Sequence, residues 1–223
     1  PNSSNTLAAQ DIRIVILDFD HTELATPING KTKSLITVQT KEIMGPGGSW
    51  NGQDGSIYVN GDSSYDMSFT KWSSLYMRTY LNNTVLGAIP SGDFKSAIKQ
   101  SKHNRLTTNG SSSKTTESVT DTLFLPSYPE VFGNVAYGNY LNNATPAGEE
   151  GTQFKYYETQ SNRIKYGNNN GSPNSTACYW WEGSASSNYH SSSGYRWCNV
   201  RTDGSANDYA GDAARGLAPA FAM

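Results

Sequence analysis

Hydrophobic positions alternate with other residues near the start of the chain, over residues 12–19. A period of two is typical of a strand with one buried face. The face expected to be buried carries Ile12, Ile14 and Ile16. A second apolar run at residues 35–40 predicts another strand, and the Asn29-Gly30 pair between the two runs is a strong turn signal. We therefore expect the two strands to pair.

The hydrophobic spacing becomes helical further along the chain. Trp72, Leu75, Tyr76 and Thr79 fall at i, i+3, i+4 and i+7, which predicts an amphipathic helix that ends at Asn82-Asn83. A second helix is expected after Pro90, because Ser91 can cap its first turn and Asp93 suits a helix N-terminus. Its buried stripe would be Phe94, Ala97 and Ile98.

Polar or glycine-rich stretches separate these elements and are interpreted as loops, at residues 45–66, 101–120, 134–150 and 168–174. Residues 153–165 are expected to form a short helix. Residues 1–10 are small and polar and are interpreted as a disordered lead-in. Paired strands, two helices and extensive loop indicate the α+β class, and no linker divides residues 11–223.

The last third of the chain, from Cys178 to Met223, has a different pattern. Apolar residues punctuate it at Trp180, Trp181, Trp197, Val200, Leu217 and Phe221. Between them lie stretches such as ASSNYHSSSGYR, which are almost entirely small or polar. A core needs residues of the first kind, whereas a binding surface tolerates the second. We interpret the segment as a scaffold that displays a changeable surface.

Composition supports a binding role but does not require one. Charged residues make up 16% of the chain, against roughly 25% in an average globular protein. Fourteen tyrosines occur with 21 glycines and many serines and asparagines, a vocabulary typical of binding loops. A loop-rich extracellular or virion protein would also show it. The net charge of −2 provides no basic surface for nucleic acid, and no apolar run is long enough to insert into a membrane.

The residue types that usually carry chemistry form no recognisable motif. Three histidines are scattered, at positions 21, 103 and 190, and none has metal-ligand spacing. Nucleophile-elbow, phosphate-loop and zinc-protease motifs are missing from the sequence. We therefore assign no catalytic residue, no metal ligand and no cofactor. Cys178 and Cys198 could form a disulfide or remain two thiols.

Several segments resemble a known family. They include IRIVILDFDHTEL, LPSGDFKSAIK, TDTLFLPSYPEVFG, EGTQFKYYETQSNRIK and the terminal GLAPAFAM. Together they are similar to a domain family common in gut bacteria and their viruses, over roughly residues 12–223. Many members end in a WWLRSP-like segment, and several are variable proteins of diversity-generating retroelements. Here that segment reads WWEGSA. The resemblance implies a C-type-lectin fold related to the formylglycine-generating-enzyme fold, with a variable segment at about 182–215.

In such variable proteins, mutagenesis of asparagine codons reaches Ser, Tyr, His, Asp, Gly, Ala, Cys and Arg, among others, but not Trp, Glu, Lys, Gln or Met. Residues 185–195 and 206–212 all belong to the reachable set. Trp180, Trp181 and Trp197 lie outside it, as a fixed scaffold should, and so does Glu182. An ordinary serine- and glycine-rich surface loop would fit the same set.

The resemblance leads us to expect a ligand- or receptor-binding protein, not an enzyme. The candidate ligand-binding positions are Ser186, Ser187, Asn188, Tyr189, His190, Tyr195, Asn199, Arg201, Asn207, Asp208, Tyr209 and Asp212. The candidate scaffold positions are Trp180, Trp181, Trp197, Gly204 and Phe221. The expected partner is a protein or glycan on a target cell, bound from a virion tail-fibre tip or a prokaryotic cell surface. The chain is a possible homo-oligomer.

Two alternatives stay open. The first is an enzyme on the same fold that uses Cys178 and Cys198 as a redox centre. The second is a structural virion or surface protein with an invariant C-terminus.

Overall fold

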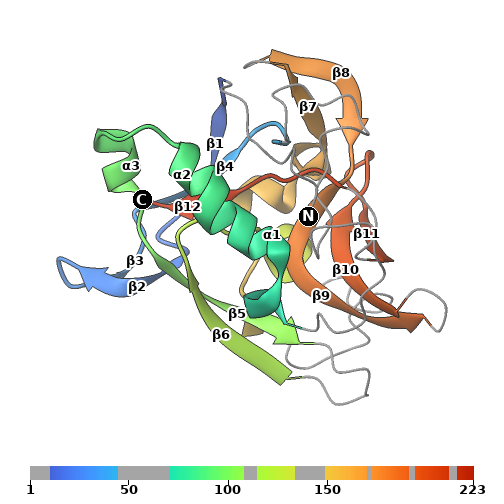
Figure 1. The fold of residues 1–223 in the computed structure, drawn as a ribbon, viewed down its shortest axis with the longest axis horizontal. Helices are drawn as coiled ribbons and strands as arrows, with labels where there is room; N and C mark the ends of the chain where they lie inside the picture. Colours follow the sequence, from blue (N-terminus) through green and yellow to red (C-terminus); the bar gives the residue numbers. More distant parts are fainter. Residues whose placement is uncertain are drawn as a thin grey trace.

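The computed structural model describes residues 11–44, 71–107, 115–133, 149–169, 172–190, 194–210 and 215–223 (Figure 1). This part of the chain is an α+β arrangement of short antiparallel strands, grouped into small sheets, with few helices. The predicted lead-in at 1–10 and the predicted loop at 45–66 lie outside the described residues, as does most of 134–150.

The first and the last strands of the described chain belong to one three-stranded sheet of order β1-β4-β12. Its strands are β1 (Ile14–Phe19), β4 (Ile36–Thr40) and β12 (Ala220–Ala222). The central residue Val38 lies opposite Ile16 on one side and Phe221 on the other. The expected pairing of the first two strands is confirmed, and the C-terminal strand completes their sheet.

The face of β1 that is buried is not the predicted one. Ile14 and Ile16 are 43% and 47% exposed, whereas Leu17 is 1% exposed. Val15 also packs against the core. Periodicity could not choose between the faces because Val15 and Leu17 are as apolar as the isoleucines, and a bulge after Ile16 shifts the register.

A second sheet has the order β3-β2-β5-β6. Its strands are β2 (Glu23–Ile28), β3 (Lys31–Lys33), β5 (Ser101–Thr107) and β6 (Thr115–Asp121). Asn29 and Gly30 have φ values of 51° and 76°, which confirms the predicted turn and closes a β2–β3 hairpin.

The interpretation of 101–120 as an exposed loop is wrong, because most of it forms the β5–β6 hairpin. The inward side chains of β5 are polar but hydrogen-bonded, so the strand carries little hydrophobic signal. Ser101 and His103 are both buried, and the Ser101 Oγ lies 2.7 Å from the His103 Nε2. Burial of polar groups is tolerated when they are paired in this way.

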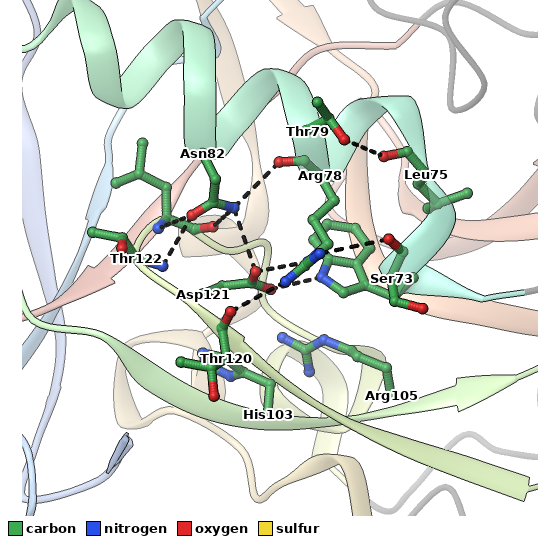
Figure 2. A network of polar contacts seen from close by, with 12 residues as sticks. Ser73, Leu75, Arg78, Thr79, Asn82, His103, Arg105, Thr120, Asp121 and Thr122 are labelled. Atoms are coloured by element: carbon green, nitrogen blue, oxygen red, sulfur yellow. Dashed lines mark hydrogen bonds and ion pairs between the residues drawn. The ribbon is translucent and has the colours of Figure 1, made fainter. Parts of the chain in front are cut away.

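The first predicted helix is present but extends further than expected. After a 3-10 turn at Trp72–Ser74 (η1), α1 (Tyr76–Thr79) runs through a π-helical segment, η2 (Tyr80–Val85), into α2 (Leu86–Ala88). Asn82 does not end the helix but lies inside the π-helical segment, and its side chain contacts the end of β6 and the residues after it. Its Oδ1 accepts hydrogen bonds from the backbone N–H groups of Thr122 and Leu123, at 2.9 and 3.0 Å (Figure 2).

Asp121 ties the same helix to the end of β6. Its buried carboxylate accepts hydrogen bonds from the Trp72 Nε1, at 2.8 Å, and from the Arg78 Nε, at 2.7 Å (Figure 2). A buried carboxylate is stable only with such partners. The helix is therefore fixed on the β5–β6 hairpin by polar contacts as well as by its apolar stripe.

Asp121→Ala should lower the free energy of unfolding by about 2 kcal/mol, because it leaves the Trp72 indole N–H without an acceptor and the Arg78 side chain without its ion pair. Urea denaturation measures the change. Asp93→Ala, at an exposed position, is the control and should cost well under 1 kcal/mol. Equal losses in the two variants would contradict the anchoring role.

The remaining helices are short: α3 (Asp93–Ala97), α4 (Tyr128–Phe132), and the 3-10 turns η5 (Lys155–Glu158) and η6 (Gln160–Arg163). The N-cap of α3 is Gly92 instead of the predicted Ser91, and Phe94 is exposed, edge-on to Phe221. The single helix expected at 153–165 is the pair of 3-10 turns. None of the described helices has the length and apolar character needed to cross a bilayer.

The C-terminal third forms two further sheets. A hairpin of β7 (Lys165–Asn169) and β8 (Ser172–Cys178) replaces most of the loop expected at 168–174. The other sheet, of order β11-β10-β9, lies at the right of Figure 1. Its strands are β9 (Trp180–His190), β10 (Gly194–Val200) and β11 (Ala206–Ala210).

Adjacent tryptophans at the start of β9 join two hydrophobic clusters. Trp181 packs in a cluster with Trp72 and Trp197, whereas Trp180 packs in a second cluster with Tyr157. Successive residues of a strand point to opposite sides, so β9 contributes one indole to each cluster. This position gives the sheet a rigid base.

Candidate functional site

Most of the predicted ligand-binding positions lie on the β9–β10–β11 sheet. Tyr189 of β9 lies opposite Tyr195 of β10 in the register, and His190 lies opposite Gly194. The side chains of Ser187, Asn188, Tyr189, His190 and Tyr195 lie outside the described part of the structure, and so does Asp212. The sheet thus brings the two ends of the serine-rich stretch together on neighbouring strands.

Four of the candidate positions are interior, which corrects their placement on the surface: Ser186, Asn199, Asn207 and Asp208. Asp208 accepts a hydrogen bond from the Ser186 Oγ, at 2.6 Å, and pairs with Arg196, at 3.0 Å. Each of the four makes side-chain contacts across the strands, and these contacts support the sheet. Their residue types belong to the reachable set, yet composition could not distinguish a displayed asparagine from a buried one.

Asn199 and Asn207 are directly opposite each other in the register. The Asn207 Nδ2 donates to the Asn199 Oδ1, at 3.1 Å. Arg201, which is exposed, donates from its Nη2 to the Asn207 Oδ1, at 3.0 Å. The two buried asparagines therefore orient the exposed side chain of Arg201 through this chain of hydrogen bonds.

Tyr209 is the exposed aromatic residue of β11, with 45% of its surface accessible. The Arg215 guanidinium lies 4.7 Å from its ring centroid and 4.6 Å from that of Tyr179. An arginine stacked between two aromatic rings is held by cation–π attraction. We call Tyr179, Arg201, Tyr209 and Arg215 the display face.

The candidate scaffold positions are all buried. Trp180 and Trp181 are inaccessible, and Trp197 and Phe221 are nearly so. Gly204 has a φ of +79°, and a Cβ there would lie 2.8 Å from the Gln160 carbonyl oxygen. Only glycine suits that turn.

Two buried carboxyl groups lie at β9 and are not among the candidate positions: Glu182 belongs to the strand, and Glu150 contacts it through Ser184. Glu182 is fully buried, and neither of its carboxyl oxygens has a hydrogen-bond partner among the described residues. Burial raises its pKa well above the usual range, and the nearby charge of Glu150 raises it further. The only sequence signal for this group is a glutamate placed directly after two core tryptophans.

Glu150 is also buried, but its oxygens are paired. Its Oε1 accepts from the Leu106 backbone N–H, at 2.8 Å, and its Oε2 accepts from the Ser184 Oγ, at 2.7 Å. Burial nevertheless raises its pKa to about 7, against the opposing effect of the Arg105 charge. Perturbed carboxyl groups of this kind often mark functional sites, although they also occur in structural networks.

Glu182→Gln should make the protein more stable at pH 8 but not at pH 4. The folded-state pKa of Glu182 is raised, so the folded state retains a proton that the unfolded state releases as the pH increases. Stability falls above the unfolded pKa, by up to about 1.4 kcal/mol per pH unit, until the folded pKa is reached. Glutamine mimics the protonated side chain and removes this loss.

Urea unfolding of both proteins at pH 4, 6 and 8 measures the effect. Glu158→Gln, at an exposed position, is the matched control and should behave as the unmodified protein does. A Glu182→Gln variant that is less stable at every pH would show that the carboxyl group has a partner worth more than its desolvation cost.

Cys178 and Cys198 are both buried, and no disulfide joins them. Burial raises the pKa of Cys178 to about 12. The thiolate is the reactive form of cysteine, and almost none is present at neutral pH with such a pKa. The Cys178 thiol is therefore not activated in this structure.

Comparison with known proteins places the chain in a family. Residues 55–223 match the profile of the family described as Domain of unknown function (DUF6273), so the chain belongs to it. No curated protein and no solved structure matches the chain significantly.

Proposed function

We propose that this member of the DUF6273 family is a ligand- or receptor-binding protein without catalytic activity, whose C-terminal surface is diversified by a retroelement. The observation that carries the proposal is the division within one sheet. Trp180 and Trp181 fix β9 in two separate clusters, while Tyr209 of β11 and Arg201, just after β10, are exposed. A frame that does not depend on its surface residues can accept changes in them.

The display face has the residue types that dominate interface energetics. Aromatic and arginine side chains commonly contribute more than about 2 kcal/mol each at the centre of an interface. Arg215 is already stacked between Tyr179 and Tyr209, and Arg201 is oriented by Asn207. Little conformational entropy would be lost when such preordered groups bind.

The fold would be C-type-lectin-like, and the partner a protein or glycan on a target cell. The chain would act at a virion tail-fibre tip or on a prokaryotic cell surface, and a homo-oligomer is one form it could take there. It would neither bind nucleic acid nor insert into a membrane.

The test is to sequence the codons for Cys178 to Met223 in the population from which the gene comes. We expect substitutions at adenine positions of a nearby, nearly identical repeat. They should concentrate at exposed positions such as Arg201 and Tyr209 and spare buried ones such as Trp197 and Asn199. An invariant segment would overturn diversification and favour a structural surface protein.

Tyr209→Ala should weaken binding at least tenfold while changing the melting temperature little, because the ring is 45% exposed. Binding is measured on a glycan array and on surface-protein extracts of candidate target cells. Tyr166→Ala is the matched control, since Tyr166 is also exposed, at 40%, but lies on β7. Equal binding by both variants would exclude Tyr209 from the interface, and a large loss of stability would place it in the core.

A further inference from the structure

A polar cleft of about 430 Å³, whose lining includes no residue of the display face, lies among β2, β3, β5 and residues 149–152. This volume is within the range of small-molecule sites. Its lining contains no large aliphatic or aromatic carbon side chain; it consists of His, Lys, Glu, Asn, Ser and Thr residues and one glycine. A ligand for this cleft must therefore be small and hydrophilic.

The charged residues of the cleft lie at two depths, some buried at its floor and others exposed at its rim. Glu130 and Glu150 reach it from the interior and are 4% and 2% exposed. Lys33 and Lys102 are exposed residues at its rim. Two exposed glutamates, Glu23 and Glu149, are also at the rim, and Glu23 lies opposite Lys33 in the β2–β3 register. The cleft thus has an acidic floor and a rim on which the two lysines lie among two glutamates.

Both floor carboxylates are held in place. The Glu130 Oε2 accepts from the Ser127 backbone N–H, at 2.7 Å, in the capping box of α4. Gly151 has a φ of +129°, and a Cβ there would lie 2.9 Å from the Glu130 Cγ. Any larger residue at position 151 would clash with the Glu130 side chain, so this position requires glycine. Glu150 is held by Leu106 and Ser184, as described above.

The floor has more negative groups than positive ones. Arg105 lies 3.7 Å from Glu130 and also acts on Glu150. The groups that face Glu150 are Arg105 from β5, Glu130 from α4 and Glu182 from β9. His103, which also lines the cleft, is kept neutral because burial lowers its pKa well below the usual range. One further cation in the cleft would balance this group.

We propose that the cleft binds a small zwitterion, an α-amino acid, whose ammonium group pairs with Glu150 and whose carboxylate meets Lys33 and Lys102. The acidic floor accounts for the ammonium group and the two rim lysines for the carboxylate. A neutral sugar would leave the excess negative charge of the floor without a counter-ion.

Binding should then depend on pH. An ammonium ion pairs with the ionised form of Glu150, whose pKa is about 7 in the free protein. Below that pH a proton competes for the carboxylate, so the affinity should fall about tenfold per pH unit. Above pH 8 the affinity should be constant until the ligand ammonium itself loses its proton.

The experiment titrates the full chain with L-alanine, L-alaninamide and N-acetyl-L-alanine, followed by amide chemical shifts. L-Alanine should bind most tightly at pH 8. L-Alaninamide, which lacks the carboxylate, should bind at least threefold more weakly, and N-acetyl-L-alanine, which lacks the ammonium group, should not bind. Equal binding of all three, binding of glucose instead, or no binding of L-alanine would each overturn the proposal.

Two variants separate the roles of floor and rim. Glu150→Gln should abolish L-alanine binding. Lys102→Ala, at an exposed position, should weaken L-alanine binding at least threefold without affecting L-alaninamide, so the test does not depend on the buried variant folding. Unchanged L-alanine affinity in Lys102→Ala would contradict the proposed orientation. Because the display face is untouched in both variants, their outcome is independent of the proposed receptor-binding function.

Discussion

Trp181→Ala should lower the free energy of unfolding by about 3–5 kcal/mol, the usual cost of removing a large aromatic side chain from a core. Trp181 is inaccessible to solvent. Its cluster includes Trp197 of β10 and Leu75 beside the central helix. The backbone N–H of Trp181 also donates to the Gly216 carbonyl, at 3.0 Å, which holds the C-terminal segment against β9. Because the cluster also includes Leu217 and Phe221, the side chain packs with three parts of the chain.

Chemical denaturation followed by tryptophan fluorescence and circular dichroism measures this loss. Trp181→Phe is an intermediate control, because it keeps an aromatic ring and leaves a smaller cavity. Tyr209→Ala is the surface control from the same sheet and should cost less than about 1 kcal/mol. A similar loss for Trp181→Ala and Tyr209→Ala would contradict the separation of frame and display face.

Arg105→Ala should be comparably destabilising at pH 8, by about 3–5 kcal/mol, because it leaves buried carboxylates without their cation. Arg105 has no accessible surface. Its Nη2 donates to the Leu125 carbonyl, at 2.9 Å, its Nη1 lies 3.7 Å from Glu130, and its guanidinium lies 6.0 Å from the Trp72 ring. Loss of the side chain affects a hydrogen bond, an ion pair and packing together.

The loss should be smaller at pH 5. Glu150, whose pKa in the folded protein is about 7, is then protonated and no longer needs a counter-ion. Lys102→Ala is the matched control, since Lys102 lies on the same strand but is exposed. An Arg105→Ala loss that does not change between pH 5 and pH 8 would show that packing, not charge, accounts for the effect.

The candidate site could be only partly predicted from the sequence. Tryptophan positions 180, 181 and 197 were selected as scaffold, and all three are buried. Serine, asparagine and aspartate positions in the same segment were assigned to the surface, yet Ser186, Asn199, Asn207 and Asp208 are interior. A polar residue becomes buried when a partner is available, and the partners here come from other strands.

The buried carboxyl groups show the same limit more clearly. Nothing in the EEG sequence at residues 149–151 distinguishes Glu150, which is buried, from Glu149, which is exposed. The difference comes from Leu106 and Ser184, which are 44 and 34 residues away in the chain. The polar cleft depends on the same long-range contacts and was not predicted.

The sequence by itself determined the features that depend on neighbouring residues. The Asn29-Gly30 turn, the strands at the two early apolar runs and the presence of a helix in the Trp72–Thr79 region follow from local conformational preference and periodicity. Only the tertiary structure decided which face of β1 is buried, that polar residues 101–107 form an interior strand, and which residues of the C-terminal segment reach the surface. The reason is physical, because burial of a polar group and the choice between two apolar faces depend on partners that folding brings from distant parts of the chain.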